Sequence, residues 1–242
     1  MVQLRSLIQL RYNHVLERIQ KAASVSGRNP DDIHLVVVTK AQPLQAIQSL
    51  IELGVQNLGE NYVEEALSKK AKLENPDILS WHMIGHIQSR KASFVSKEFD
   101  YVHSLDSIKL AEHLNRAAME ANRLLPVFLE CNVSGEKTKY GWQCWEKTKW
   151  PELGEAVQKI SNLPALKICG LMTMAPYTEN PEESRSYFKR LAQVRDYLSS
   201  QAPDENWSEL SMGMSADFEV AIQEGATWVR IGQAILGQRS GK

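Results

Sequence analysis

The chain has 242 residues, of which 43% are hydrophobic and 24% are charged, as in ordinary soluble globular proteins. Its formal net charge of −1 excludes a global basic field that would attract nucleic acid, and no run of about 18 apolar residues predicts a membrane span. Three cysteines, an odd number without close pairing, argue against a disulfide framework or a cysteine metal site, so a cytoplasmic location is expected.

The first 25 residues are predicted to form an amphipathic helix that covers one end of the fold. Apolar residues recur there at helical spacing, but Arg5, Arg11 and Arg18 interrupt them. A signal peptide needs an unbroken apolar stretch of roughly 7–15 residues, which this segment lacks. We therefore expect residues 1–25 to pack on the folded protein.

From residue 33 onward, apolar β-branched runs alternate with longer amphipathic runs. Strands are predicted at 33–39, 55–59, 81–84, 101–104, 125–133, 166–172, 207–211 and 227–231. Helices are predicted at 43–53, 64–73, from about 89, and at 106–121, 151–160, 182–200 and 216–224. Asp106 is predicted to be the N-cap of its helix.

Eight consecutive strand–helix units predict an α/β fold, a single (β/α)8 TIM-type barrel formed by residues 1–242. An open doubly wound sheet is the alternative. The dinucleotide motif G-x-G-x-x-G is absent after the first strand, because that strand ends in Thr39-Lys40-Ala41. No linker, low-complexity tract or change in composition marks a second domain.

Two local patterns are interpreted as structural. The loop 135–150 carries three tryptophans among lysines, and we expect a partly exposed connection with buried rings rather than a nucleic-acid stacking platform. His82 and His86 have a spacing that suits a metal on a helix, but residues 80–85 are predicted to be a strand and its exit. No metal site is therefore expected.

Lys40 is the most unusual residue at the predicted strand exits. The carboxyl ends of barrel strands share one face, where the chemistry of such folds lies. Lys40 follows an apolar strand and is expected to project into the barrel mouth. Desolvation there lowers the pKa of an amine, as imine formation requires. The alternative is a lysine that extends from the strand end into water.

The exits of the seventh and eighth strands predict a phosphate site. They carry Ser211-Met212-Gly213 and Arg230-Ile231-Gly232. In this architecture, the loops after these two strands often bind phosphate through backbone N–H groups, which glycine allows an anion to approach closely. Simple tight turns are the alternative. A lysine on the first strand facing such a cradle is a more specific combination than either feature alone.

Several motifs closely resemble those of the pyridoxal-phosphate homeostasis proteins, in the same order along almost the whole chain. They are V-V-V-T-K at 36–40, L-G-E-N-Y-V at 58–63, W-H-M-I-G-H-I-Q at 81–88, G-L-M-T-M-A-P at 170–176, S-M-G-M-S-A-D at 211–217 and R-I-G at 230–232. That family is similar to the barrel domain of alanine racemase and of ornithine-decarboxylase-like enzymes. The resemblance implies the same barrel and pyridoxal 5′-phosphate (PLP) as the cofactor.

The resemblance also implies roles for individual residues. Lys40 would carry PLP as an aldimine, Asn61 would lie near the cofactor ring, and Arg230 would face the pyridine nitrogen. The phosphate would be held by Ser211, Gly213, Gly232 and Gln233. The loop 141–150 has no place in this pattern.

Arg230 bears on catalysis. A guanidinium, with a pKa above about 12, can only donate a hydrogen bond, so a ring nitrogen facing it stays unprotonated and PLP becomes a poor electron sink. In the racemases a second acid–base group, a tyrosine, comes from a C-terminal β domain of the partner subunit, and this chain ends ten residues after Gly232. We therefore expect a protein of vitamin B6 and amino-acid homeostasis that binds PLP without appreciable catalysis.

Two other functions stay open on the sequence. A PLP-dependent amino-acid racemase or decarboxylase could use the same barrel, and an aldolase could use Lys40 on a sugar phosphate without a cofactor. For the homeostasis function, the resemblance implies delivery of PLP to acceptor apoenzymes. We expect a monomer that binds neither nucleic acid nor membrane.

Overall fold

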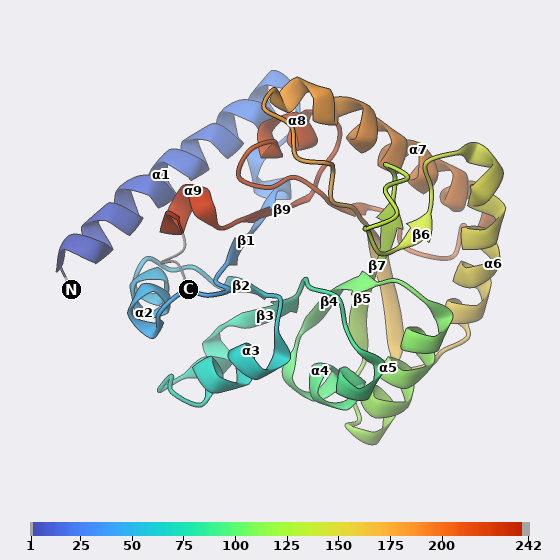
Figure 1. The fold of residues 1–242 in the computed structure, drawn as a ribbon, viewed down its shortest axis with the longest axis horizontal. Coiled ribbons are helices and arrows are strands. Elements are labelled where there is room, and N and C mark those ends of the chain that lie inside the picture. The colour runs from blue at the N-terminus through green and yellow to red at the C-terminus, as the bar shows by residue number, and fades with distance from the viewer. Residues whose placement is uncertain (1, 239–242) are drawn as a thin grey trace.

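The computed structural model describes residues 2–238, within which eight parallel strands close into a barrel (Figure 1). The barrel strands are β1 (His34–Val38), β2 (Asn57–Glu60), β3 (Ser80–Met83), β4 (Tyr101–Leu105), β5 (Leu125–Asn132), β7 (Leu166–Met172), β8 (Glu209–Ser211) and β9 (Trp228–Ile231). Their order is β4-β3-β2-β1-β9-β8-β7-β5, and pairing of β4 with β5 closes the ring. A two-residue strand, β6 (Trp142–Gln143), pairs with β5 outside the ring.

Helices surround the strands on the outside of the barrel (Figure 1). They are α1 (Val2–Val25), α2 (Leu44–Glu52), α3 (Val63–Lys70), α4 (Ala92–Glu98), α5 (Ile108–Glu120), α6 (Trp150–Ser161), α7 (Arg185–Gln201), α8 (Phe218–Gln223) and α9 (Gln233–Leu236). Short 3-10 helices lie at Pro30–Asp32, Pro76–Ile78, Ser89–Lys91, Lys147–Lys149 and Pro181–Ser184. α1 packs against α2, α8 and α9, so the predicted N-terminal helix is confirmed.

The predicted barrel class is confirmed, and each predicted strand is present with ends that shift by no more than two residues. The predicted N-cap of α5 is wrong. Ser107 caps the helix by accepting a hydrogen bond from Leu110 N at 3.3 Å, and it has the extended backbone that an N-cap needs. Asp106 instead pairs with His86. β6 and α9 are too short for hydrophobic periodicity to predict them.

Two apolar layers stabilise the barrel. The larger layer includes Val37 and Leu58 and lies between the strands and the helices. The smaller layer lies inside the barrel and consists of Val36, Phe128, Cys169, Met172 and Trp228. Because neighbouring residues of a strand point to opposite faces, Val36 and Val37 belong to different layers.

The tryptophan loop agrees with its prediction in part. Trp150 is buried and donates from Nε1 to the Cys144 carbonyl oxygen at 3.1 Å, whereas Trp142 and Trp145 are half-buried. All three cysteines are free and buried. Within residues 2–238, no helix is long and apolar enough to cross a bilayer. Residues 1 and 239–242 of the predicted domain lie outside the described residues.

Candidate functional site

Lys40 lies in the turn that follows β1, separated from the carboxyl end of the strand by Thr39. Its neighbour Ala41 has a φ of 57°, in the left-handed region that few non-glycine residues adopt. Lys40 is half-buried and lines a cavity of about 360 Å³ together with Gly232 and Gln233. Three of the predicted site residues, from distant parts of the chain, therefore meet at one cavity.

The loop after β8 meets the first turn of α9 beside this cavity. Ser215 Oγ accepts a hydrogen bond from Ala234 N at 3.2 Å. A Cβ on Gly232 would lie 3.0 Å from the Val38 carbonyl oxygen, so glycine lets this turn pack closely on β1. A hydroxyl beside backbone N–H groups suits an anion. Ser215 was not among the predicted site residues, and its only signal in the sequence is the second serine of S-M-G-M-S.

Ser211 and Gly213 occupy other positions. Ser211 is fully buried inside the barrel, with Oγ 2.6 Å from Arg230 Nη1 and 2.7 Å from His103 Nδ1. Gly213 has a φ of 94°, and a Cβ there would lie 2.6 Å from Ala221 Cβ of α8. Ser211 is thus placed to support Arg230, and Gly213 is needed for a turn that packs on α8.

Arg230 on β9 extends into the barrel, where it is only 4% exposed. Nη1 donates to Ser211 Oγ at 2.6 Å, and Nη2 donates to the Thr173 carbonyl oxygen at 2.8 Å. Burial lowers the pKa of the guanidinium to about 10, and the nearby carboxyls of Asp217 and Glu130 oppose that shift. Arg230 therefore keeps its charge at neutral pH and acts only as a donor.

A column of neutral groups continues from Ser211 through the barrel interior. His103 Nε2 lies 3.0 Å from His82 Nδ1, and His82 Nε2 lies 3.1 Å from Asn57 Oδ1. Burial lowers the pKa of His82 to about 3 and the pKa of His103 well below its usual value, so both rings are neutral. We call Ser211, His103, His82 and Asn57 the barrel column, and Arg230 bonds to its Ser211 end.

Hydrogen-bond chemistry gives the barrel column one direction. The Asn57 carbonyl only accepts, so His82 donates from Nε2 and accepts at Nδ1. His103 therefore donates from Nε2 and accepts at Nδ1, where the Ser211 hydroxyl donates. The Ser211 oxygen then accepts from Arg230. Every member has a partner, and the guanidinium is fixed in orientation.

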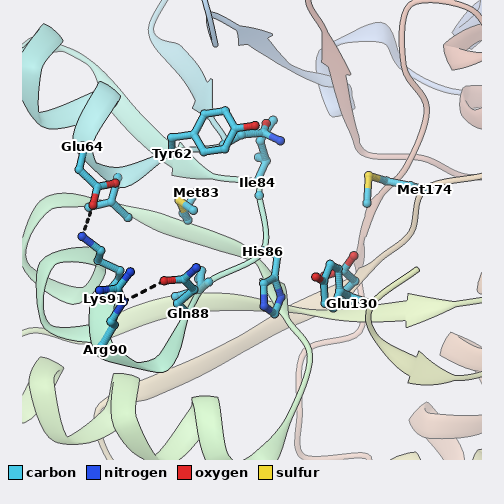
Figure 2. Close-up of a pocket in the computed structure, with 15 residues that line it drawn as sticks. Tyr62, Glu64, Met83, Ile84, His86, Gln88, Arg90, Lys91, Glu130 and Met174 are labelled. Carbon is cyan, nitrogen blue, oxygen red and sulfur yellow. Dashed lines mark hydrogen bonds and ion pairs between the residues drawn. The ribbon is translucent and has the colours of Figure 1, made fainter. Parts of the chain in front are cut away.

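A larger cavity, of about 520 Å³, opens beside the ends of β2, β3 and β5 (Figure 2). Asn61 lines it, and Asn61 Oδ1 is buried without a hydrogen-bond partner among residues 2–238. Leaving a buried carbonyl unpaired is costly, so Asn61 is suited to receive a donor from a bound molecule. A Cβ on Gly85 would lie 2.5 Å from the backbone carbonyl oxygen of Asn61, so glycine allows the two strand exits to approach closely.

Glu130 is the carboxyl of this cavity. It is 3% exposed and lies beside His86, with the Glu64–Lys91 pair on the other side of the cavity (Figure 2). Burial raises the pKa of Glu130 to about 7; the charge of Asp106 adds to the rise and nearby Arg230 opposes it. A carboxyl that titrates near neutrality is suited to proton transfer.

His82 and His86 do not converge on a common point. His82 belongs to the barrel column, whereas His86 pairs with Asp106 at 3.0 Å and stacks on Tyr140. Within residues 2–238, no group of three or more His, Cys, Asp or Glu side chains could hold a metal ion. The residues that line the two cavities instead offer the amine of Lys40, the amide of Asn61 and the carboxyl of Glu130.

Comparison with known proteins matches residues 11–240 to the family described as alanine racemase, N-terminal domain. A pyridoxal phosphate homeostasis protein from Aquifex aeolicus is 41% identical over 230 residues, which cover 95% of this chain and 97% of that protein. The match thus covers nearly the whole length of both proteins.

Solved structures give a consistent picture. PipY of Synechococcus elongatus with PLP bound is 34% identical, with a TM-score of 0.79 over 91% of this chain and 100% of that chain. An alanine racemase of Clostridium difficile has a TM-score of 0.73 but only 15% identity, over 98% of this chain and 58% of that chain. The racemase likeness therefore concerns the fold alone.

Proposed function

This chain belongs to the family of pyridoxal phosphate homeostasis proteins. On that premise we propose that it binds PLP through Lys40 and takes part in balancing the levels of vitamin B6, amino acids and keto acids. Residues 1–242 would form one PLP-binding domain, with 1–25 as its covering helix. The observation that carries the proposal is the meeting of Lys40, Gly232 and Gln233 at one cavity.

The residues of the site suit each part of the cofactor. PLP supplies an aldehyde that condenses with an amine, and Lys40 offers that amine. The backbone at Gly232 and Gln233, with the Ser215 hydroxyl beside it, offers donors to the phosphate. Asn61, which lines the larger cavity and has an unpaired side-chain oxygen, would orient the bound ring.

Arg230 supports binding without appreciable catalysis. Its guanidinium only donates, so a ring nitrogen facing it would stay unprotonated and the ring would be a weaker electron sink. In this proposal Ser211 acts through Arg230, and Gly213 shapes the turn beneath the cradle. The protein would hold PLP as a cytoplasmic monomer and release it to acceptor apoenzymes.

The direct test is covalent trapping. Purified protein loaded with PLP is expected to absorb near the violet edge, and borohydride reduction should fix the cofactor to a single lysine. Peptide mapping by mass spectrometry should identify that lysine as Lys40. An aldolase that needs no cofactor would show neither signal, and an adduct on another lysine would contradict the proposal.

The second candidate is a PLP-dependent amino-acid racemase or decarboxylase. Glu130 favours it, because a carboxyl with a pKa of about 7 at the mouth could act as a second acid–base group. We expect no turnover of alanine, serine or basic amino acids above the rate of free PLP. Turnover well above that rate, lost in both Lys40→Ala and Glu130→Gln, would establish the enzyme instead.

A further inference from the structure

Side chains of α3 hold the backbone on both sides of Lys40. Lys69 Nζ donates to the Thr39 carbonyl oxygen at 2.6 Å, and Ala41 N donates to Glu65 Oε1 at 2.6 Å. The groups held are the carbonyl immediately before Lys40 and the amide immediately after it. We call Glu65 and Lys69 the α3 clamp.

The two residues of the α3 clamp also bond to each other and to β2. Lys69 Nζ donates to Glu65 Oε1 at 2.7 Å and to Glu60 Oε1 at 2.6 Å. With the Thr39 carbonyl, Nζ therefore has three acceptors, which matches the three donors of an ammonium group. Glu60 Oε1 also accepts from Thr39 Oγ1 at 2.6 Å, so the ends of β1, β2 and α3 are joined.

Burial makes this cluster rigid. Glu60 is fully buried and Lys69 is 7% exposed. Desolvation raises the pKa of Glu60, and Lys69 opposes that rise. Charge-assisted hydrogen bonds are short and directional, and a buried charge without its partner is strongly unfavourable. The cluster therefore resists displacement of any one member.

The turn that the α3 clamp holds is an uncommon one. Ala41 has a φ of 57°, a conformation that a residue with a Cβ adopts only when its surroundings impose it. The side chain of Lys40 leaves the backbone in the middle of this turn and lines the cavity that contains Gly232 and Gln233. The direction of Lys40 thus depends on contacts made by α3.

We propose that Glu65 and Lys69 are positioning residues that set the direction in which Lys40 presents its amine to an aldehyde. The proposal rests on the proposed covalent role of Lys40. In that step the neutral amine adds to the aldehyde carbon, the carbon–oxygen double bond is replaced by a carbon–nitrogen double bond, and the oxygen leaves as water. The α3 clamp acts on this step and leaves the phosphate cradle unchanged.

Two ligands separate the covalent step from binding. PLP reports on both, whereas 4′-deoxypyridoxine 5′-phosphate has the ring and phosphate but no aldehyde. Lys69→Met is expected to slow covalent attachment of PLP by on the order of tenfold or more, because small misplacements of a reacting group have effects of this size. Its affinity for the aldehyde-free compound is expected to equal that of the wild type.

Lys70→Met is the matched control. Lys70 is the next residue of α3, but it bonds to Glu98 of α4, so both measurements should stay at wild-type values. Wild-type attachment rates in Lys69→Met, or equal losses for both ligands, would overturn the inference. A wild-type protein that forms no adduct would instead remove the proposed function of Lys40.

Glu65→Ala decides the matter if Lys69→Met does not fold. It removes the acceptor of Ala41 N but leaves the buried contact of Lys69 with Glu60 in place. Slower covalent attachment with unchanged affinity for the aldehyde-free compound supports the inference. Wild-type attachment in this variant overturns it.

Discussion

Lys40 and Arg230, the two basic side chains of the proposed site, are supported in different ways. The α3 clamp holds the backbone on both sides of Lys40 through an ionic cluster. In Arg230 the guanidinium itself is held, because it donates to Ser211 Oγ at the end of the neutral barrel column. One support fixes the main chain, and the other fixes the functional group itself.

The two kinds of support suit the different chemical roles proposed for Lys40 and Arg230. An amine that forms and breaks a covalent bond must lose and regain a proton and change its bonding partner. Support through the backbone is compatible with that chemistry, because it does not act on the amine itself. A guanidinium that only donates must keep one orientation, and a chain of neutral hydrogen bonds provides that without adding another charge to the interior. The two supports can therefore be tested separately.

Removal of the Lys40 amine is expected to have the largest effect. Lys40→Ala should lose the borohydride-trapped adduct completely, because no other group in the proposal forms that bond. Lys40 lies in a turn outside the packed layers, so the free energy of unfolding should change by about 0.5 kcal/mol or less. Absorbance, intact mass and urea unfolding check these outcomes, and a persistent adduct would contradict them.

Loss of the phosphate contacts is expected to come next. Pyridoxal should bind far more weakly than PLP, because two or three charge-assisted hydrogen bonds of about 1.5–3 kcal/mol each are lost. Gly232→Val should weaken PLP binding but hardly alter pyridoxal binding, since its Cβ would crowd Val38. Gly154→Ala on α6, where a Cβ has space, is the control. Calorimetry that finds equal affinities for the two vitamers would place the cradle elsewhere.

Breaking the ionic support should destabilise the protein strongly. Lys69→Met leaves Glu60 buried without its partner, so we expect a loss of about 3–5 kcal/mol in the free energy of unfolding. Lys70→Met removes a more exposed contact and should cost about 0–1 kcal/mol. Urea unfolding of the cofactor-free variants gives both values. Equal losses would show that burial does not distinguish these two lysines.

Glu130, which lies near Arg230, should make the free energy of unfolding depend on pH. Its pKa is raised from 4.5 to about 7, so the folded protein binds this proton more tightly than the unfolded chain does. The contribution of Glu130 to the free energy of unfolding is fully present below pH 4.5. It falls by about 3 kcal/mol in all as the pH rises to about 7. Glu130→Gln should lack that slope. Parallel stability curves for the two proteins would contradict the raised pKa.

Breaking the neutral column is expected to have the smallest effect. His103→Phe leaves the Ser211 hydroxyl proton without an acceptor and His82 Nδ1 without a donor, which should cost about 1–3 kcal/mol. His103→Gln can both accept and donate, so it should recover part of that loss. Nitrogen NMR of His82 should report a proton on Nε2 in the wild type. A proton on Nδ1 would reverse the direction assigned to the column.

Most of the fold and part of the site follow from the sequence. The alternation of apolar strands with amphipathic helices is a local pattern, so it located the barrel strands and placed Lys40 at a strand exit. The N-cap of α5 was missed by one residue, because Asp106 and Ser107 are both suitable side chains and only the backbone angles distinguish them. Glycine at the last strand exit also pointed to the turn at 232.

Tertiary structure alone decided which polar side chains meet. Ser211 and Ser215 are the same type of residue in one short motif. Ser211 nevertheless contacts His103, 108 residues away, whereas Ser215 contacts the first turn of α9. Likewise, Lys69 reaches a carbonyl 30 residues away. Such contacts depend on the stagger and closure of the strands, which bring distant residues to one level of the barrel. Local sequence sets the period of each element, but closure of the ring sets which side chains face each other across it.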